Sequence, residues 1–192
     1  MIPFPSETQA LLFDCDGTLV DSMPIHVECW QATLADYGID LPKAFIDDRA
    51  GMPTNTIVEH INAEFAVSLA PPVITSEKEA RYLARLPELQ PIDTVLATAR
   101  QHYGKLPMAV ASGSVRHVVI ESLQAVKALE MFPVLVTADD PVEAKPSPEI
   151  FLEAARQLGA EPTKCHVFED GDHGINAARA AGMTWTDVRA LV

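Results

Sequence analysis

The 192-residue chain lacks any run of apolar residues that approaches the roughly 20 needed to span a membrane. Its first stretch, MIPFPSETQA, has no basic region, apolar core or cleavage site, so we expect no secretory signal. Cysteine is scarce: the chain has three, Cys15, Cys29 and Cys165, and none of them belongs to a CxxC motif. We therefore expect reduced, buried thiols in a cytoplasmic protein.

Positive charge is scarce as well. The chain has 14 Lys and Arg residues against 27 Asp and Glu residues, which gives a formal net charge of −13. A surface this acidic repels nucleic acid and anionic membranes, so we expect neither as a partner. A small anionic substrate remains compatible with this charge if a metal ion, a lysine or helix N-termini supply a local positive site.

Apolar residues gather in five short segments of the length of buried parallel strands. Helical patterns separate most of them, such as SVRHVVIESLQAVKAL, SPEIFLEAARQLG and GINAARAAG. In the second of these patterns, Ser147 is predicted to cap the helix, Pro148 to be its first residue and Gly159 to end it. The alternation predicts an α/β fold with a Rossmann-like, mostly parallel sheet flanked by helices. The predicted strands are Ala10–Asp14, Pro107–Ser112, Pro133–Thr137, Cys165–Glu169 and Thr184–Val188.

One interval is too long for a single crossover helix, since about ninety residues separate the first two predicted strands. This stretch contains three helical patterns, PIHVECWQATLADYG, NTIVEHINAEF and TSEKEARYLARL, and a predicted loop at LAPPV. We interpret residues 22–91 as a small helical cap domain. It is inserted into a core domain formed by residues 1–21 and 92–192.

Polar side chains follow the predicted strands at the edge where parallel sheets bind ligands. Two carboxylates that lie close together repel each other and raise each other's pKa, so a cation or another partner must offset that cost. A divalent cation, a lysine and hydroxyl groups beside paired carboxylates indicate phosphoryl transfer, with one carboxylate as nucleophile and another moving a proton. The residues are Asp14, Asp16, Ser112-Gly113-Ser114, Lys145 and Glu169-Asp170.

Four segments, FDCDGTLVDS, ASGS, KPSPEIF and FEDGDHGINAARAAGM, resemble the ordered motifs of the haloacid dehalogenase superfamily. The chain looks like the subgroup with a helical cap after the first motif, which includes β-phosphoglucomutase and small sugar-phosphate phosphatases. Its C-terminal run CHVFEDGDHGINAARAAGMTWTDVR is similar to the branch often described as fructose-1-phosphate or 6-phosphogluconate phosphatases.

This resemblance implies a role for each core residue. Asp14 would be the nucleophile, and Asp16 would protonate the leaving oxygen and then activate water. Both would also hold Mg²⁺, Asp16 through its backbone carbonyl. Ser112 would hold the transferred phosphoryl group, and so would Lys145, which also screens the charge of Asp14.

Two acidic residues complete the implied metal site. Asp170 would bind Mg²⁺ directly. Glu169 would bind it directly or through water, with a purely supporting role as the alternative.

Signals in the predicted cap are weaker. His26 matches a histidine that meets the acid–base aspartate in mutase-like members, and Lys78 matches a cap lysine, although a solvated helix face explains Lys78 equally well. Core packing is the favoured explanation for Trp30. Ser22 is either a helix cap or a contact to Asp16. The predicted substrate-binding residues are Ser22, His26, Gly51, Asn55, Lys78, Ser112, Gly113, Ser114 and Arg116.

Two departures favour a phosphatase over a mutase. β-Phosphoglucomutases carry an arginine shortly after the cap-loop glycine, where this chain has Thr54, and a lysine after the second serine of SxS, where it has Val115. Arg116 is a candidate replacement for one of these contacts. We expect a monomeric enzyme that hydrolyses a small, fructose-1-phosphate-like sugar phosphate with Mg²⁺ through an aspartyl-phosphate, with the mutase as the alternative.

Three further classes are less compatible with the motifs. A receiver domain of two-component signalling lacks the second aspartate and the cap insertion. A non-catalytic phosphate-sensing protein would be expected to lose at least one of Asp14, Asp16, Lys145 and Asp170, all of which are present. A true dehalogenase needs no Mg²⁺ and normally lacks an aspartate at the position of Asp16.

Overall fold

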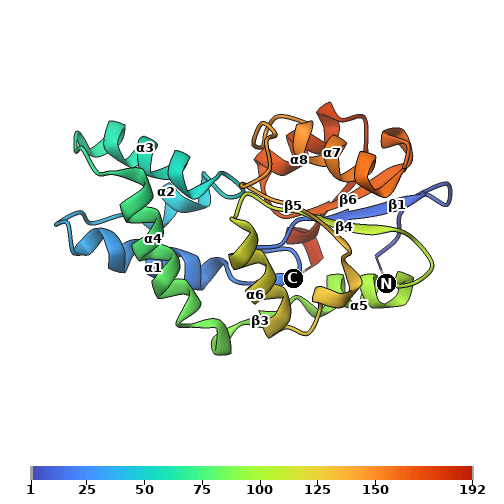
Figure 1. Ribbon diagram of the computed structural model, residues 1–192, viewed down its shortest axis with the longest axis horizontal. Coiled ribbons are helices and arrows are strands. Elements are labelled where there is room, and N and C mark those ends of the chain that lie inside the picture. Colours follow the sequence, from blue (N-terminus) through green and yellow to red (C-terminus); the bar gives the residue numbers. More distant parts are fainter. Residues whose placement is uncertain (1, 192) are drawn as a thin grey trace.

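A five-stranded parallel sheet forms the centre of one half of the molecule (Figure 1). The computed structural model describes residues 2–191. The strand order is β5-β4-β1-β6-β7, so the first strand lies in the middle. The α/β fold is thus confirmed, and each strand ends within a residue of its predicted limits. The strands are β1 Ala10–Phe13, β4 Met108–Ala111, β5 Val134–Val136, β6 Cys165–Glu169 and β7 Thr184–Asp187.

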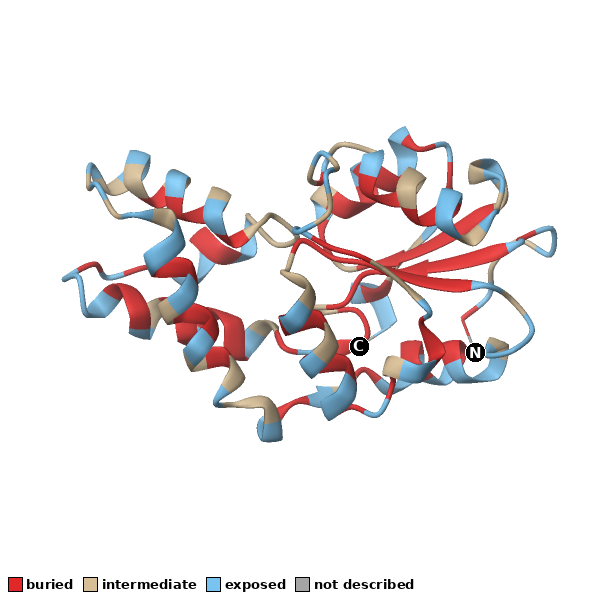
Figure 2. Cartoon of the chain, viewed as in Figure 1, coloured by how far each residue is buried: buried red, intermediate tan, exposed pale blue. Residues whose placement is uncertain are grey.

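Helices cover both faces of this sheet, and β1 contributes to both cores. Leu11 and Phe13 pack in the cluster shared with α5 (Asp93–His102) and α6 (Arg116–Ala125). Ala10 and Leu12 pack in the opposite cluster, shared with α7 (Glu149–Leu158) and α8 (Asp172–Ala180). This alternation follows the two-residue period of a strand. Because both faces are buried (Figure 2), β1 is a continuous apolar run.

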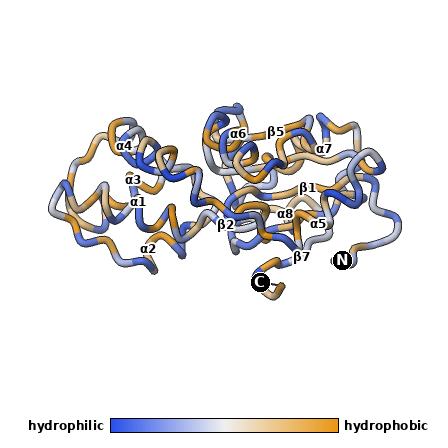
Figure 3. Tube along the Cα trace, turned by 90° about the horizontal axis from the view of Figure 1, so that it is seen from below, coloured by the Kyte–Doolittle hydropathy of each residue, from blue (hydrophilic) through white to orange (hydrophobic). Residues whose placement is uncertain are grey.

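Four helices form a separate lobe at one end of the sheet, as Figures 1 and 3 show from two directions. They have their own hydrophobic cluster, which includes Val27, Trp30, Phe45, Val58 and Ile74. We call this part the helical lobe. Its helices are α1 Met23–Ala35, α2 Lys43–Asp47, α3 Thr54–Phe65 and α4 Pro71–Leu83.

The chain enters and leaves the helical lobe at one place. Strand β2 (Val20–Asp21) pairs in antiparallel fashion with β3 (Gln90–Pro91), so the two crossing segments lie side by side. No helix within residues 2–191 has the length and apolar character that a membrane crossing requires. The described part of the chain also contains four short 3-10 helices: η1 Leu86–Glu88, η2 Leu129–Met131, η3 Pro162–Lys164 and η4 Val188–Leu191.

Two local predictions were wrong. The predicted loop LAPPV contains the start of α4, because Pro71 and Pro72 occupy the first turn, where proline costs no hydrogen bond. Helix α7 begins at Glu149, one residue later than predicted, with Pro148 at the N-cap position. Ser147 still accepts a long hydrogen bond of 3.4 Å from the backbone N–H of Glu149, as expected of a cap. The predicted end at Gly159 is confirmed, since this glycine adopts φ +66°.

A buried histidine links folding stability to pH. His166 on β6 is only 3% exposed, and its Nδ1 and Nε2 atoms lie 2.8 and 2.9 Å from the hydroxyls of Thr184 and Thr186. Burial lowers the pKa of His166 to about 4. The unfolded chain, in which the pKa is about 6.5, therefore takes up the proton first as the pH falls.

We expect this histidine to contribute up to about 2 kcal/mol to the loss of unfolding free energy between pH 7 and pH 5. Urea unfolding of the wild type and of His166→Gln at the two pH values tests this. The variant should lose correspondingly less stability over that range. Equal losses in both proteins would contradict the assignment.

Candidate functional site

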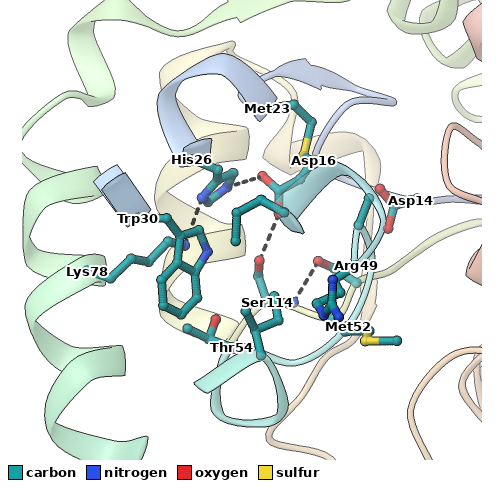
Figure 4. A pocket seen from close by; sticks show the side chains of 16 residues that line it. Asp14, Asp16, Met23, His26, Trp30, Arg49, Met52, Thr54, Lys78 and Ser114 are labelled. Atoms are coloured by element: carbon teal, nitrogen blue, oxygen red, sulfur yellow. Dashed lines mark hydrogen bonds and ion pairs between the residues drawn. The ribbon is translucent and has the colours of Figure 1, made fainter. Parts of the chain in front are cut away.

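The carboxyl edge of the sheet and the helical lobe enclose a pocket (Figure 4). Asp14 follows β1, and Ser112-Gly113-Ser114 follows β4. On the other side, helices α1, α2, α3 and α4 and the turn after α2 contribute side chains. The lining residues are Asp14, Asp16, Met23, His26, Trp30, Ile46, Arg49, Ala50, Gly51, Met52, Thr54, Ile57, Lys78, Ser112, Gly113 and Ser114.

A buried lysine joins two carboxylates beside this pocket. The Nζ atom of Lys145 donates hydrogen bonds to Oδ1 of Asp14 at 2.6 Å and to Oε1 of Glu169 at 2.7 Å. The side chain of Lys145 is fully buried. Burial by itself would lower the lysine pKa, but Asp14 and Glu169 outweigh it and raise that pKa above its ordinary value. The two carboxylates thus favour the charged form of Lys145 at the sheet edge.

Both carboxylate oxygens of Glu169 are occupied by protein donors. While Oε1 accepts from Lys145, Oε2 accepts from the backbone N–H of Gly171, and the residue is 1% exposed. These contacts orient Lys145 and the start of α8. The geometry therefore favours a supporting position for Glu169 over direct contact with a metal ion.

Two carboxyl groups near Lys145, those of Asp14 and Asp170, have raised pKa values. Burial, together with the charges of Glu169, Asp170 and Asp16, raises the pKa of Asp14 against the opposing effect of Lys145. Burial and then Glu169 raise the pKa of Asp170 to about 7, although the Thr18 hydroxyl donates to it at 3.1 Å. Like charges in a space that excludes water create a need for a cation.

The donor set fits Mg²⁺. The side chains of Asp14 and Asp170, with the backbone carbonyl of Asp16, offer the hard oxygen ligands that this ion prefers. Within residues 2–191, no group of three or more His, Cys, Asp or Glu side chains is placed so that these side chains alone could hold a metal ion. Mg²⁺ usually keeps several waters and shares its ligands with substrate phosphate, so two carboxylates and a carbonyl are sufficient.

Gly17 makes room for this arrangement. It adopts φ +85°, and a Cβ atom there would lie 2.1 Å from Oδ2 of Asp170. Any other residue would therefore suffer both backbone strain and a clash. The glycine allows the turn after Asp16 to lie directly against Asp170.

Asp16 receives hydrogen bonds from both sides of the pocket. Its Oδ1 accepts from the Ser22 hydroxyl at 2.7 Å and lies 3.0 Å from Nε2 of His26, while its Oδ2 accepts from the Ser114 hydroxyl at 2.8 Å. Burial would raise the pKa of Asp16, but His26 and the two serines reverse this and hold it below its ordinary range. Ser22 contacts Asp16 and forms no side-chain cap on α1.

A chain of polar contacts continues from Asp16 into the helical lobe. Nδ1 of His26 lies 2.8 Å from Nζ of Lys78. Burial and then the charge of Lys78 lower the pKa of His26, and burial lowers the pKa of Lys78. A protonated Lys78 can only donate, so Nδ1 of His26 accepts its hydrogen bond. Nε2 of His26 then carries the ring proton and donates a hydrogen bond to Asp16. Lys78 is 4% exposed, so it does not lie on a solvated helix face.

An aromatic residue that sequence reasoning missed holds this chain in place. The ring of Tyr82 stacks on His26 with centroids 4.1 Å apart and planes 3° apart. The Tyr82 hydroxyl lies 2.8 Å from the hydroxyl of Ser122 on α6. Tyr82 is four residues after Lys78 on α4, a helical spacing that places the two on one face. That spacing was the available sequence signal.

The other predicted substrate residues are distributed unevenly. Gly51 lines the pocket, whereas Asn55 and Arg116 are not among its lining residues. The Asn55 side chain accepts a hydrogen bond from Thr75, and Arg116 pairs with Asp140 at 2.8 Å. Trp30 lines the pocket and also belongs to the hydrophobic cluster of the lobe.

Arg49 is a pocket residue that sequence reasoning did not identify. It precedes Gly51, whereas the position compared with mutases is Thr54, which also lines the pocket. Arg49 lies in a turn just after α2, outside any periodic pattern. No sequence signal therefore marked it.

The chain matches the family model described as "Haloacid dehalogenase-like hydrolase" over residues 11–188. It is 39% identical over 183 residues to the fructose-1-phosphate phosphatase YqaB of Escherichia coli (strain K12), an alignment that covers 94% of this chain and 96% of that protein.

Solved structures resemble the fold over nearly the whole chain. CbbY from Rhodobacter sphaeroides, in complex with phosphate, is 26% identical with a TM-score of 0.77, covering 93% of this chain and 84% of that one. A β-phosphoglucomutase from Clostridium difficile has a TM-score of 0.79 at 24% identity, covering 96% and 87% of the two chains. At that identity, the second likeness concerns the fold alone.

Gly113 permits the helical lobe to approach the sheet edge. A Cβ atom on Gly113 would lie 2.3 Å from the carbonyl oxygen of Gly51, a contact that forces the lobe's loop to move. Overpacking of this kind typically costs about 1–3 kcal/mol. We expect Gly113→Ala to speed amide hydrogen exchange in residues 49–52 by at least about 5-fold, because local opening becomes easier.

Gly171→Ala is the matched control for this prediction. Its Cβ atom would lie 3.4 Å from the carbonyl oxygen of Ala50, so it presses on the same loop much less. Exchange measured by mass spectrometry should therefore change little in the control. Unchanged exchange in Gly113→Ala would show that the lobe does not rest on this glycine.

Proposed function

Because this chain belongs to the haloacid dehalogenase-like hydrolase family, we propose that it is a Mg²⁺-dependent phosphatase acting on a small sugar phosphate through an aspartyl-phosphate. The observation that carries this proposal is the pair formed by Asp14 and Asp16 (Figure 4). Asp14 is bound to Lys145, and Asp16 is held by three hydrogen-bond partners from both sides of the pocket. These contacts support a role in attack for one carboxylate and a role in proton transfer for the other.

Asp14 supplies the nucleophile in the first step. Its Oδ1 is bound to Lys145, which leaves Oδ2 to attack phosphorus. The new bond joins Oδ2 to phosphorus, and the bond from phosphorus to the sugar oxygen breaks. Asp16 is a carboxylate in the free site, so it first takes up a proton from solvent as the anionic substrate binds beside it, and it then gives that proton to the leaving oxygen. Lys145 and Ser112 hold the phosphoryl oxygens as negative charge develops on them.

Water completes the reaction in a second step. Asp16, now a carboxylate, takes a proton from a water molecule whose oxygen attacks phosphorus. The bond between Asp14 and phosphorus breaks, which releases inorganic phosphate and restores Asp14. Ser22, His26 and Ser114 keep Asp16 in place through both steps.

Mg²⁺ would be held by the carboxylates of Asp14 and Asp170 and by the backbone carbonyl of Asp16. When bound, it supplies positive charge to the phosphoryl oxygens and relieves the repulsion among the carboxylates. The raised pKa values of Asp14 and Asp170 support this placement, because both carboxyls lie where their charged forms need compensation.

Residues 22–91 would act as a cap over the core formed by residues 1–21 and 92–192. Ser22 and His26 from this segment form hydrogen bonds with Asp16, the proposed acid–base residue, and the segment also provides most of the pocket wall. The cap thereby excludes bulk water from the reaction and selects the leaving group. The name of the Escherichia coli relative supports a fructose-1-phosphate-like substrate.

The β-phosphoglucomutase reaction is the second candidate. Arg49 supports it, because an arginine lines the pocket despite the threonine at position 54. A mutase passes the phosphoryl group to a second oxygen of the same sugar and releases no phosphate. The two candidates thus differ in their products.

Phosphate release from a panel of sugar phosphates with Mg²⁺ tests the proposal. We expect release from fructose 1-phosphate or a similar ester, and loss of the activity with EDTA that is restored by added Mg²⁺. Conversion of β-glucose 1-phosphate to glucose 6-phosphate without free phosphate would establish the mutase instead. Full activity in EDTA would contradict the metal requirement.

Asp14→Asn tests the covalent route. An amide is a far poorer nucleophile than a carboxylate, so turnover should fall by at least about 1,000-fold while the far-UV spectrum stays unchanged. Asp36→Asn is the control, since Asp36 lies outside the pocket and pairs with Arg81. Substantial activity in a folded Asp14→Asn protein would overturn the role of Asp14.

A further inference from the structure

Arg49 projects into the pocket from the turn that follows α2. Its Nε donates to Nδ1 of His60 at 3.2 Å, and its Nη1 donates to the backbone carbonyl of Phe45 at 2.8 Å. The guanidinium carbon lies 3.6 Å above the centre of the Phe45 ring. A stacked guanidinium with two fixed donors has lost much of its freedom before any ligand binds.

The charge of Arg49 is not neutralised by the protein. Within residues 2–191, Arg49 forms no ion pair, whereas Arg81, Arg85 and Arg116 each pair with an acidic side chain. These two contacts use donors on Nε and Nη1, so Nη2 keeps both of its donors. Arg100 and Arg179 also form no ion pair within these residues, but of the three arginines it is Arg49 that lines the pocket.

Other cations near the pocket are already engaged. Lys145 binds Asp14 and Glu169, and Lys78 binds His26. The proposed reaction uses Lys145 and Ser112 for the transferred phosphoryl group. The charge of Arg49 is therefore available to another part of the same substrate.

The surroundings of Arg49 suit an anion. The turn rests on the sheet edge, because a Cβ atom on Gly113 would lie 2.3 Å from the Gly51 carbonyl oxygen. Ile46, Met52 and Ile57 line the pocket wall near this turn. Apolar neighbours reduce solvent screening and so strengthen an ionic contact.

We propose that Arg49 binds a second acidic group of the substrate, a carboxylate or another phosphate. The substrates with the highest kcat/KM would then be sugar phosphates that carry an additional anionic group, and fructose 1-phosphate, whose remainder is neutral, would be hydrolysed with a lower kcat/KM. This inference rests on the proposed phosphatase function. It identifies the class of substrate that the helical lobe selects.

Two substrate pairs test this inference. The first pair is fructose 1-phosphate and fructose 1,6-bisphosphate, and hydrolysis of the bisphosphate at position 1 is measured as the formation of fructose 6-phosphate. The second pair is glucose 6-phosphate and 6-phosphogluconate. We expect kcat/KM of the wild type to favour the acidic member of at least one pair by about 10-fold or more. The pair that responds distinguishes a phosphate from a carboxylate.

Arg49→Gln removes the charge but keeps a hydrogen-bonding side chain. We expect this variant to lower the ratio of acidic to neutral kcat/KM by about 10-fold or more. Arg81→Gln is the matched control, because Arg81 is a helical-lobe arginine paired with Asp36 outside the pocket, and its ratio should equal that of the wild type. A wild type without preference, or an Arg49→Gln protein with an unchanged ratio, would overturn the inference.

Calorimetric binding to Asp14→Asn separates this inference from the phosphatase proposal. The variant should bind the acidic member of the responding pair more tightly, and adding Arg49→Gln should abolish that preference. Preferential binding by a wild type that releases no phosphate would support Arg49 while contradicting the proposed reaction. Phosphate release by the wild type together with equal binding of both members would support the proposed reaction and contradict the role of Arg49.

Discussion

The contact of Lys145 with Asp14 and Glu169 is the interaction on which the rest of the site depends. It ties together the ends of β1 and β6 and the loop after β5, and all three side chains are almost completely buried. One lysine cannot balance three neighbouring carboxylates, because Asp170 lies beside the pair and has a raised pKa of about 7. The sheet edge therefore holds an excess of negative charge that a bound metal ion would balance.

The helical lobe helps to orient the side chain of Asp16. A carboxylate on a short turn has many accessible rotamers, and reactivity requires one of them. Ser22 and His26 restrain one oxygen from the lobe side, and Ser114 restrains the other from the loop after β4. Tyr82 continues this restraint, since it stacks on His26 and bonds to Ser122. Asp16 is thus held by hydrogen bonds at the place where lobe and sheet meet.

The sequence predicted the sheet edge well because a general rule of topology places the carboxyl ends of parallel strands together. Asp14, Ser112 and Lys145 each follow a strand whose limits an apolar run reveals, and the structure brings them together. Their chemical roles stay predictions.

The helical lobe was harder to predict because no such rule governs how its helices pack. Lys78 and His26 are 52 positions apart, and their contact depends on the packing of α4 against α1. Asn55 and Arg116 have the right residue types, but they bond to Thr75 and Asp140 outside the pocket lining. Arg49 lies in a turn without periodicity, so only the folded chain shows that it reaches the pocket.

These contacts divide the proposed reaction between two parts of the chain. Groups that touch phosphorus or its leaving oxygen lie on the sheet edge, where strand register fixes them and substitutions disturb several buried charges at once. Groups that would touch the remainder of the substrate lie on the lobe, and Arg49 is attached there through a backbone carbonyl, an imidazole and a ring. A change at Arg49 therefore leaves the contacts among Asp14, Lys145 and Glu169 in place. Substrate choice can vary on the lobe while the chemistry at the sheet edge stays constant.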